Sequence, residues 1–112
     1  MQIEYKNKKL KNLCTNIKVA KKELPNVEAE KLLKAIGLIE AAYSLHDVIS
    51  YSPFHFHNLK GDRKGEYAID INGRRSSYRL IIKPIDEDVP DIFASAKSIE
   101  IIMVWEVSKH YE

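Results

Sequence analysis

The chain has 112 residues, of which 45% are hydrophobic and 30% are charged, a composition typical of one folded globular domain and not of a disordered segment. No apolar run has membrane-spanning length and no secretory segment opens the chain, so we expect a cytoplasmic protein. Cys14 is the single cysteine, which excludes an internal disulfide, and its place on an apolar helical face favours a buried, reduced thiol.

The net charge of +2 is unevenly distributed along the sequence. Residues 1–54 carry nine positive and six negative charges, residues 55–84 carry seven and three, and residues 85–112 carry two and seven. A basic middle segment suggests a polyanionic partner, although solvated protein surfaces also produce such runs. The acidic last segment is a poor surface for nucleic acid.

The first half predicts a short strand at residues 2–5 and then a helical hairpin. From Asn7 to residue 21, apolar residues recur at three- and four-residue spacing, which predicts one helix. Its lysine-rich face is either a solvated surface or an added attraction for RNA or the ribosome. Pro25 ends this helix, Asn26 is expected to cap a second one, and the second apolar stripe runs from Ala29 to Tyr43. Residues 44–53 are expected to form an irregular connection.

The second half predicts an antiparallel sheet. Residues 66–71 alternate between apolar and polar, residues 78–83 are rich in aromatic and branched side chains, and Asn72-Gly73 is a turn signal between them. The most apolar run, residues 98–107, is expected to be a central strand. The element order β-α-α-β-β-β-β predicts one α+β domain over residues 1–112, with the first strand and the helix hairpin packed on a curved, mainly antiparallel sheet of four to five strands.

The basic segment carries a family resemblance. Residues 59–73 read Leu-Lys-Gly-Asp-Arg-Lys-Gly-Glu-Tyr-Ala-Ile-Asp-Ile-Asn-Gly, and Tyr-Arg-Leu-Ile follows at residues 78–81. This pattern resembles the HigB branch of the RelE/ParE toxin superfamily, and residues 3–10 and 106–112 are similar to that branch too. The resemblance implies the toxin of a type II toxin–antitoxin system, a ribosome-dependent mRNA endoribonuclease (mRNA interferase) that acts in the ribosomal A site, blocks translation and arrests growth. It also implies control by a HigA-like helix-turn-helix antitoxin.

Cleavage of RNA by attack of a 2′-hydroxyl on the neighbouring phosphate needs a base, an acid and cations on the phosphoryl oxygens. It needs no metal and no cofactor. Histidine is a natural proton carrier near neutral pH, arginine clamps phosphate through two nitrogens, and tyrosine can stack on a base. The candidate catalytic residues are Arg79, Arg63, His57, His110 and Tyr111. The candidate RNA-binding residues are Lys60, Lys64, Arg74 and Arg75.

The resemblance is uneven across these candidates. Arg63 and Arg79 match basic positions of the family pattern, whereas the end of the chain departs from it. The HigB branch commonly ends near Asp-Tyr-His, and this chain has Lys109-His110-Tyr111 there, without the acidic residue. The division of acid and base roles therefore stays open.

Some candidates also have structural alternatives. Arg79, among apolar and aromatic neighbours, is expected either to contact phosphate or to pair with Asp70 on the next strand. His55 and His57 share a strand face, as two metal ligands could, but no third ligand is evident nearby and no metal site is predicted. The turn at residues 74–77 is either a mobile basic finger on RNA or a neutral insertion.

Two other functions compete with the nuclease. One is a ParE-like inhibitor of DNA gyrase, and the other is a non-catalytic RNA-binding relative. A histidine and a tyrosine beside two arginines favour the nuclease over the gyrase inhibitor. The expected partners are accordingly the antitoxin, the ribosome and mRNA, with no membrane.

Overall fold

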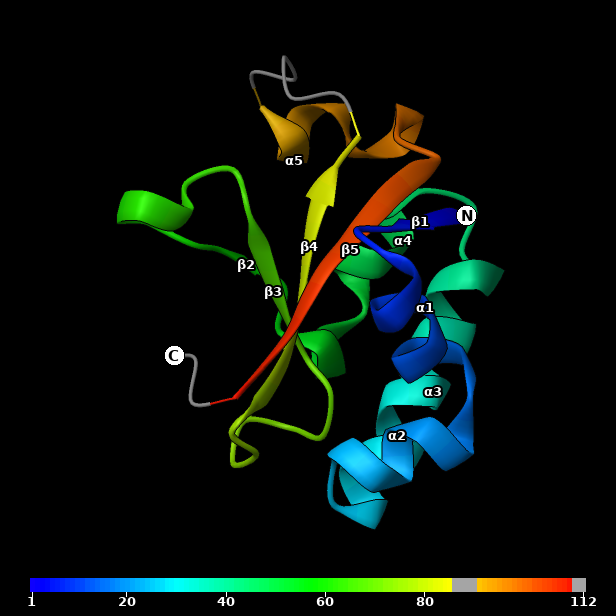
Figure 1. Cartoon of the computed structure of the whole chain (residues 1–112). Coiled ribbons are helices and arrows are strands. Elements are labelled where there is room, and N and C mark those ends of the chain that lie inside the picture. The colour runs from blue at the N-terminus through cyan, green and yellow to red at the C-terminus, as the bar shows by residue number, and fades with distance from the viewer. Residues whose placement is uncertain (86–90, 110–112) are drawn as a thin grey trace.

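A computed structural model describes residues 1–85 and 91–109 and contains a five-stranded sheet with α1 to α3 packed against one of its faces (Figure 1). In spatial order the strands are β1 (Gln2–Tyr5), β5 (Ile101–Lys109), β4 (Tyr78–Pro84), β3 (Tyr67–Asp70) and β2 (His57–Asn58). The β1–β5 pair is parallel and the other three pairs are antiparallel. This arrangement confirms the predicted α+β class.

The helical part is more divided than the sequence predicted. The α-helices are α1 (Lys8–Thr15), α2 (Ile17–Glu23), α3 (Asn26–Ala41), α4 (Leu45–Ser50) and α5 (Ile92–Ser95). Short 3₁₀ turns are η1 (Ser52–Phe54), η2 (Gly61–Arg63) and η3 (Ala96–Ser98). The single helix expected after Asn7 is wrong, because Asn16 leaves the helical conformation and its side chain accepts hydrogen bonds from the backbone N–H groups of Lys18 and Val19. Asparagine often competes with a helix in this way and caps the next one.

Three further expectations about this region are corrected. Asn26 is the first residue of α3 and Pro25 holds the cap position without a side-chain hydrogen bond. Tyr43 lies beyond the end of α3 and is 89% exposed, so it does not extend the apolar stripe. Residues 44–53 are not irregular throughout, because Leu45 and Val48 are buried in the core and hold α4 against the sheet.

The two faces of the sheet have different surroundings. Leu80 and Ile82 of β4 face the helices and join the main core, whereas Ile81 faces the other side and packs with Ala68. Successive residues of β4 thus face opposite sides of the sheet. A bulge interrupts the β4–β5 register, since Ile81 pairs with Glu106 and Ile82 pairs with Val104. The extra residue, Trp105, joins the small apolar cluster on the far face.

Glu28 links the first turn of α3 to the turn between β3 and β4. Its carboxylate accepts hydrogen bonds from Asn72 Nδ2 at 2.9 Å and from Ser76 Oγ at 2.8 Å. The hydrogen bonds from Asn72 and Ser76 lower the pKa of Glu28 below its ordinary value. The turn is thereby fastened to the helical layer.

We predict that Glu28→Gln lowers the free energy of unfolding by about 1 kcal/mol at neutral pH, the scale of a charge-assisted hydrogen-bond pair at a partly exposed site. Because the folded-state pKa is depressed, this stabilisation is present above the ordinary carboxyl pKa and is lost as the pH falls through the folded-state pKa. Urea unfolding of both proteins from neutral to acid pH measures it. Glu30→Gln, at an exposed site in the same helix, is the control. A difference between wild type and Glu28→Gln that is independent of pH would contradict the prediction.

Candidate functional site

The predicted catalytic residues of the described chain lie on the sheet face that points away from the helices. His57 is opposite Ala68, Ala68 is opposite Ile81, and Asp70 is opposite Arg79 in the strand registers. Paired residues share a face, and residues two apart on a strand share it too. His57 and Arg79 therefore lie on the same side, with Cα atoms roughly 12 Å apart by ideal strand spacing.

The ring of His57 has a defined tautomer. Its Nδ1 lies 2.8 Å from the backbone carbonyl oxygen of His55. A carbonyl oxygen only accepts hydrogen bonds, so Nδ1 is the donor in this contact, and in the neutral form of the ring the lone pair lies on Nε2. The second nitrogen is therefore set up to accept a proton from a bound group.

Arg63 is held by two carboxylates. Its Nη2 lies 2.5 Å from an oxygen of Glu66 and 2.5 Å from an oxygen of Glu106, and its Nε donates to Glu66 at 3.0 Å. Partial burial lowers the pKa of Arg63, but the hydrogen bonds to Glu66 and Glu106 outweigh it and raise the pKa above its ordinary value. The guanidinium is fixed on the sheet face, and the charge of these three side chains together is negative.

Arg79 is engaged by the protein itself. Its Nε lies 2.9 Å from Oδ1 of Asp70, and the two side chains are 11% and 1% exposed. Neither Asp70 oxygen has a well-aligned hydrogen bond within the described residues, so the attraction is mainly between charges. The other guanidinium nitrogens donate to the carbonyl oxygens of Ser76, Tyr78 and Arg74. The structure thus contains the ion pair that was the alternative to phosphate contact, and a catalytic role for Arg79 stays a prediction.

We predict that Arg79→Ala destabilises the fold by about 3–5 kcal/mol, because it leaves the buried Asp70 carboxylate without its counter-charge. Arg75→Ala, at an exposed position in the same turn, should change the stability by less than about 0.5 kcal/mol. The double variant Asp70→Asn/Arg79→Ala should recover part of the loss. Urea unfolding of the four proteins measures these differences. A loss of under about 1 kcal/mol for Arg79→Ala would mean that the pair does not hold the turn.

The candidate RNA-binding residues are exposed and form two groups. Lys60 and Lys64 flank η2, whereas Arg74 and Arg75 lie in the turn that Glu28 and Arg79 fasten. Gly61, the first residue of η2, and Gly65, which follows Lys64, have positive φ angles of 65° and 92°, which favour glycine. The remaining two candidates, His110 and Tyr111, lie outside the described residues.

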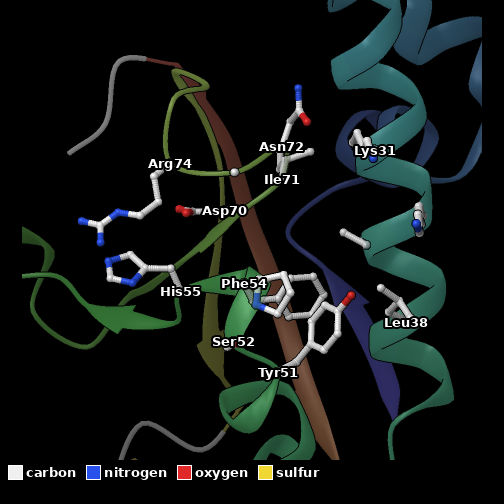
Figure 2. A pocket seen from close by; sticks show the side chains of 14 residues that line it. Lys31, Leu38, Tyr51, Ser52, Phe54, His55, Asp70, Ile71, Asn72 and Arg74 are labelled. Atoms are coloured by element: carbon white, nitrogen blue, oxygen red, sulfur yellow. The ribbon is translucent and has the colours of Figure 1, made fainter.

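A cleft of about 480 Å³, which the sequence did not predict, lies between α3, η1 and the turn after β3 (Figure 2). Side chains from all three elements line it, among them Lys31, Lys34, Tyr51, His55 and Arg74. The sequence gives little indication of this cleft, because its lining residues are far apart along the chain. Two lysines three residues apart on one helix do, however, indicate a basic helical face. Among the described residues, no group of three or more His, Cys, Asp or Glu side chains is placed to hold a metal ion. None of the described helices is long and apolar enough to cross a membrane.

Comparison with known proteins assigns the fold. No protein-family model matches the chain, and no curated protein matches it. Among solved structures, a YoeB/ParE toxin from Agrobacterium tumefaciens is similar, with a TM-score of 0.51, 14% sequence identity, and coverage of 99% of this chain and 100% of that chain. At this identity the similarity establishes the fold alone. The chain has a RelE/YoeB-like α+β fold, and the HigB subtype stays a prediction.

Proposed function

We propose that this protein is the toxin of a type II toxin–antitoxin system and that it cleaves translated mRNA on the ribosome. The fold shared with a YoeB/ParE toxin supports the toxin class. The observation that carries the nuclease is the tautomer of His57, which leaves a basic nitrogen on a sheet face that also holds Arg63 and Arg79. On this proposal the protein acts in the cytoplasm and is held inactive by a HigA-like antitoxin.

The proposed reaction is a transfer of phosphate within the RNA chain. Nε2 of His57 takes the proton of a 2′-hydroxyl, the 2′-oxygen attacks the adjacent phosphorus, and the bond from phosphorus to the 5′-oxygen breaks. The products are a 2′,3′-cyclic phosphate and a 5′-hydroxyl end, and the leaving oxygen takes a proton from an acid. His110 or Tyr111 is the proposed acid.

Because Arg63 and Arg79 are already paired with carboxylates, we expect cleavage to depend on the ribosome. A phosphate must replace a carboxylate before Arg63 or Arg79 can bind it, and that exchange costs binding free energy. Positioning of a substrate by a large assembly can supply on the order of 7–11 kcal/mol in favourable cases. Naked mRNA lacks this contribution, so it should be a poor substrate.

We predict that His57→Asn lowers mRNA cleavage by about 10²- to 10⁴-fold, the usual contribution of a general base. Asparagine can still donate a hydrogen bond to the His55 carbonyl but has no basic nitrogen. His46→Asn changes an exposed histidine on α4 and should cleave like wild type. The measurement is single-turnover cleavage on programmed ribosomes, with mapping of 5′-hydroxyl ends. If His57→Asn cleaved mRNA at the wild-type rate, His57 would not be the general base. If the wild-type protein cut naked and ribosome-bound mRNA equally, cleavage would not require the ribosome.

A non-catalytic protein of the same fold is the second candidate, because both Arg63 and Arg79 are already paired with carboxylates. It predicts growth arrest without new 5′-hydroxyl ends. Induced expression in bacteria, with 5′-end mapping and a gyrase supercoiling assay on the same protein, separates the two. Gyrase inhibition with intact mRNA would establish the ParE-like alternative, and normal growth with folded protein present would contradict a toxin. Co-expression with the adjacent reading frame tests the antitoxin.

A further inference from the structure

The cleft beside α3 is chemically different from the sheet face. Lys31 and Lys34 lie three residues apart on α3, and Arg74 lies in the turn after β3. Figure 2 shows the Arg74 side chain next to the ring of His55. The two lysines and Arg74 are all exposed. Within residues 1–85 and 91–109, none of them makes an ion pair or a side-chain hydrogen bond, in contrast to Arg63 and Arg79. The cleft therefore collects positive charge that is not neutralised within the described part of the chain.

Asp70 is the one carboxylate among the described residues that line the cleft, and it does not offset this charge. Asp70 is 1% exposed at its side chain and lies 2.9 Å from Arg79 through Oδ1 and Nε. Its negative charge is thus matched by a guanidinium that lies outside the cleft lining. Three like charges around one concavity concentrate a positive potential that attracts anions.

Aromatic side chains form the other part of the cleft. Tyr51 is 42% exposed and meets Phe54 edge to face, with ring centroids 4.8 Å apart. Leu38 extends this apolar wall along α3 and is 39% exposed. Phe54 is buried, so Tyr51 supplies the exposed ring. An exposed aromatic ring beside cations is the combination that binds single-stranded nucleic acid, because bases stack on the ring and phosphates contact the cations.

His55 adds a strained backbone at the same place. Its φ of 43° and ψ of 50° lie in the left-handed region, which non-glycine residues adopt at a cost. Figure 2 shows its ring on the same side as Arg74 and Asp70. Strain of this kind persists where the surrounding structure fixes it and is concentrated at binding and catalytic sites.

We propose that this cleft binds one nucleotide unit, with its phosphate against Lys31, Lys34 and Arg74 and its base against Tyr51. The volume of about 480 Å³ lies within the range of small-ligand sites. A free nucleotide and a nucleotide within an RNA strand offer the same chemistry. The cleft adjoins the proposed cleavage face at Asp70, and binding there needs no cleavage to be detected.

The first experiment separates phosphate contact from general attraction. The probe is a fluorescein-labelled single-stranded RNA with methylated 2′-hydroxyls, which 2′-hydroxyl attack cannot cut, and binding is followed by anisotropy over a range of salt concentrations. Lys31→Ala/Lys34→Ala/Arg74→Ala should weaken binding at least tenfold and reduce the slope of log K against log salt by about 2, since each contact with a single strand contributes about 0.7. Lys18→Ala/Lys22→Ala/Lys97→Ala removes the same number of positive charges from exposed positions outside the cleft lining. Equal losses in both triple variants would overturn the proposal.

The second experiment tests stacking. Tyr51→Ala should weaken RNA binding about tenfold without changing the salt slope, because a lost base–ring contact involves no counterion. Tyr51→Phe keeps the ring and should bind like wild type, which also controls for a folding defect. Tyr43→Ala removes a tyrosine that is 89% exposed and does not line the cleft. Unchanged affinity in Tyr51→Ala, or a loss as large in Tyr43→Ala, would overturn the base contact.

Competition identifies the source of the nucleotide. Adenosine 5′-monophosphate that displaces the labelled RNA at millimolar concentration, where inorganic phosphate does not, would support a site for a single nucleotide. Displacement by unlabelled RNA alone would support a strand-binding site. If polyglutamate displaced the labelled RNA as effectively as unlabelled RNA of equal charge, the cleft would not be a nucleotide site. That result would instead favour an acidic protein as the partner. A failure to cleave mRNA leaves each of these outcomes unaffected, so the two proposals fail separately.

Discussion

The buried carboxylate of Asp70 is the constraint on which much of this structure depends. A charge that is 1% exposed requires a counter-charge, and Arg79 supplies it from the neighbouring strand. The same guanidinium donates to carbonyl oxygens of the β3–β4 turn and so fixes that turn. From the helical side, Glu28 holds the turn through Asn72 and Ser76. The turn is fastened to both the sheet and the helices, and Arg74 is carried to the edge of the cleft.

This constraint divides the basic residues of the chain into two kinds. Arg63 and Arg79 are buried or half-buried, oriented by carboxylates, and close to the sheet face. Lys31, Lys34 and Arg74 are exposed and have no such partners among the described residues. The first kind holds its guanidinium group in a fixed position. The second kind is suited to the capture of anions, because a cation without a protein partner gives up no contact when it binds phosphate. A high local density of positive charge in the sequence therefore does not by itself locate the reacting centre.

The strands were predictable from the sequence because their signals are local. Residues 2–5 and 78–83 have the composition of strands, and Asn72-Gly73 marks the chain reversal between β3 and β4. The break at Asn16 was missed because the apolar spacing continues through it while its side chain caps the next helix. The cleft was missed for another reason. Lys31 and Arg74 are distant in sequence, and only the packing of α3 against the sheet brings them to one cavity. The Asp70–Arg79 pair was among the stated alternatives because strand register can be inferred from the turn.

On the proposed function, the paired state of Arg63 and Arg79 limits which phosphates the protein can bind. At Arg63 the two neighbouring carboxylates make the local charge negative, so a lone RNA phosphate meets repulsion as well as attraction. On the proposed function, binding energy from a larger assembly must bring the phosphate close enough to displace a carboxylate from the guanidinium. His57 needs no such exchange, since its Nδ1 already contacts the His55 carbonyl oxygen and its Nε2 is left for a substrate. On the proposed function, the base is therefore in place before the substrate arrives, whereas the phosphate clamp forms only with the substrate. Substrate positioning, rather than proton transfer, would then be the step that limits which RNA is cut.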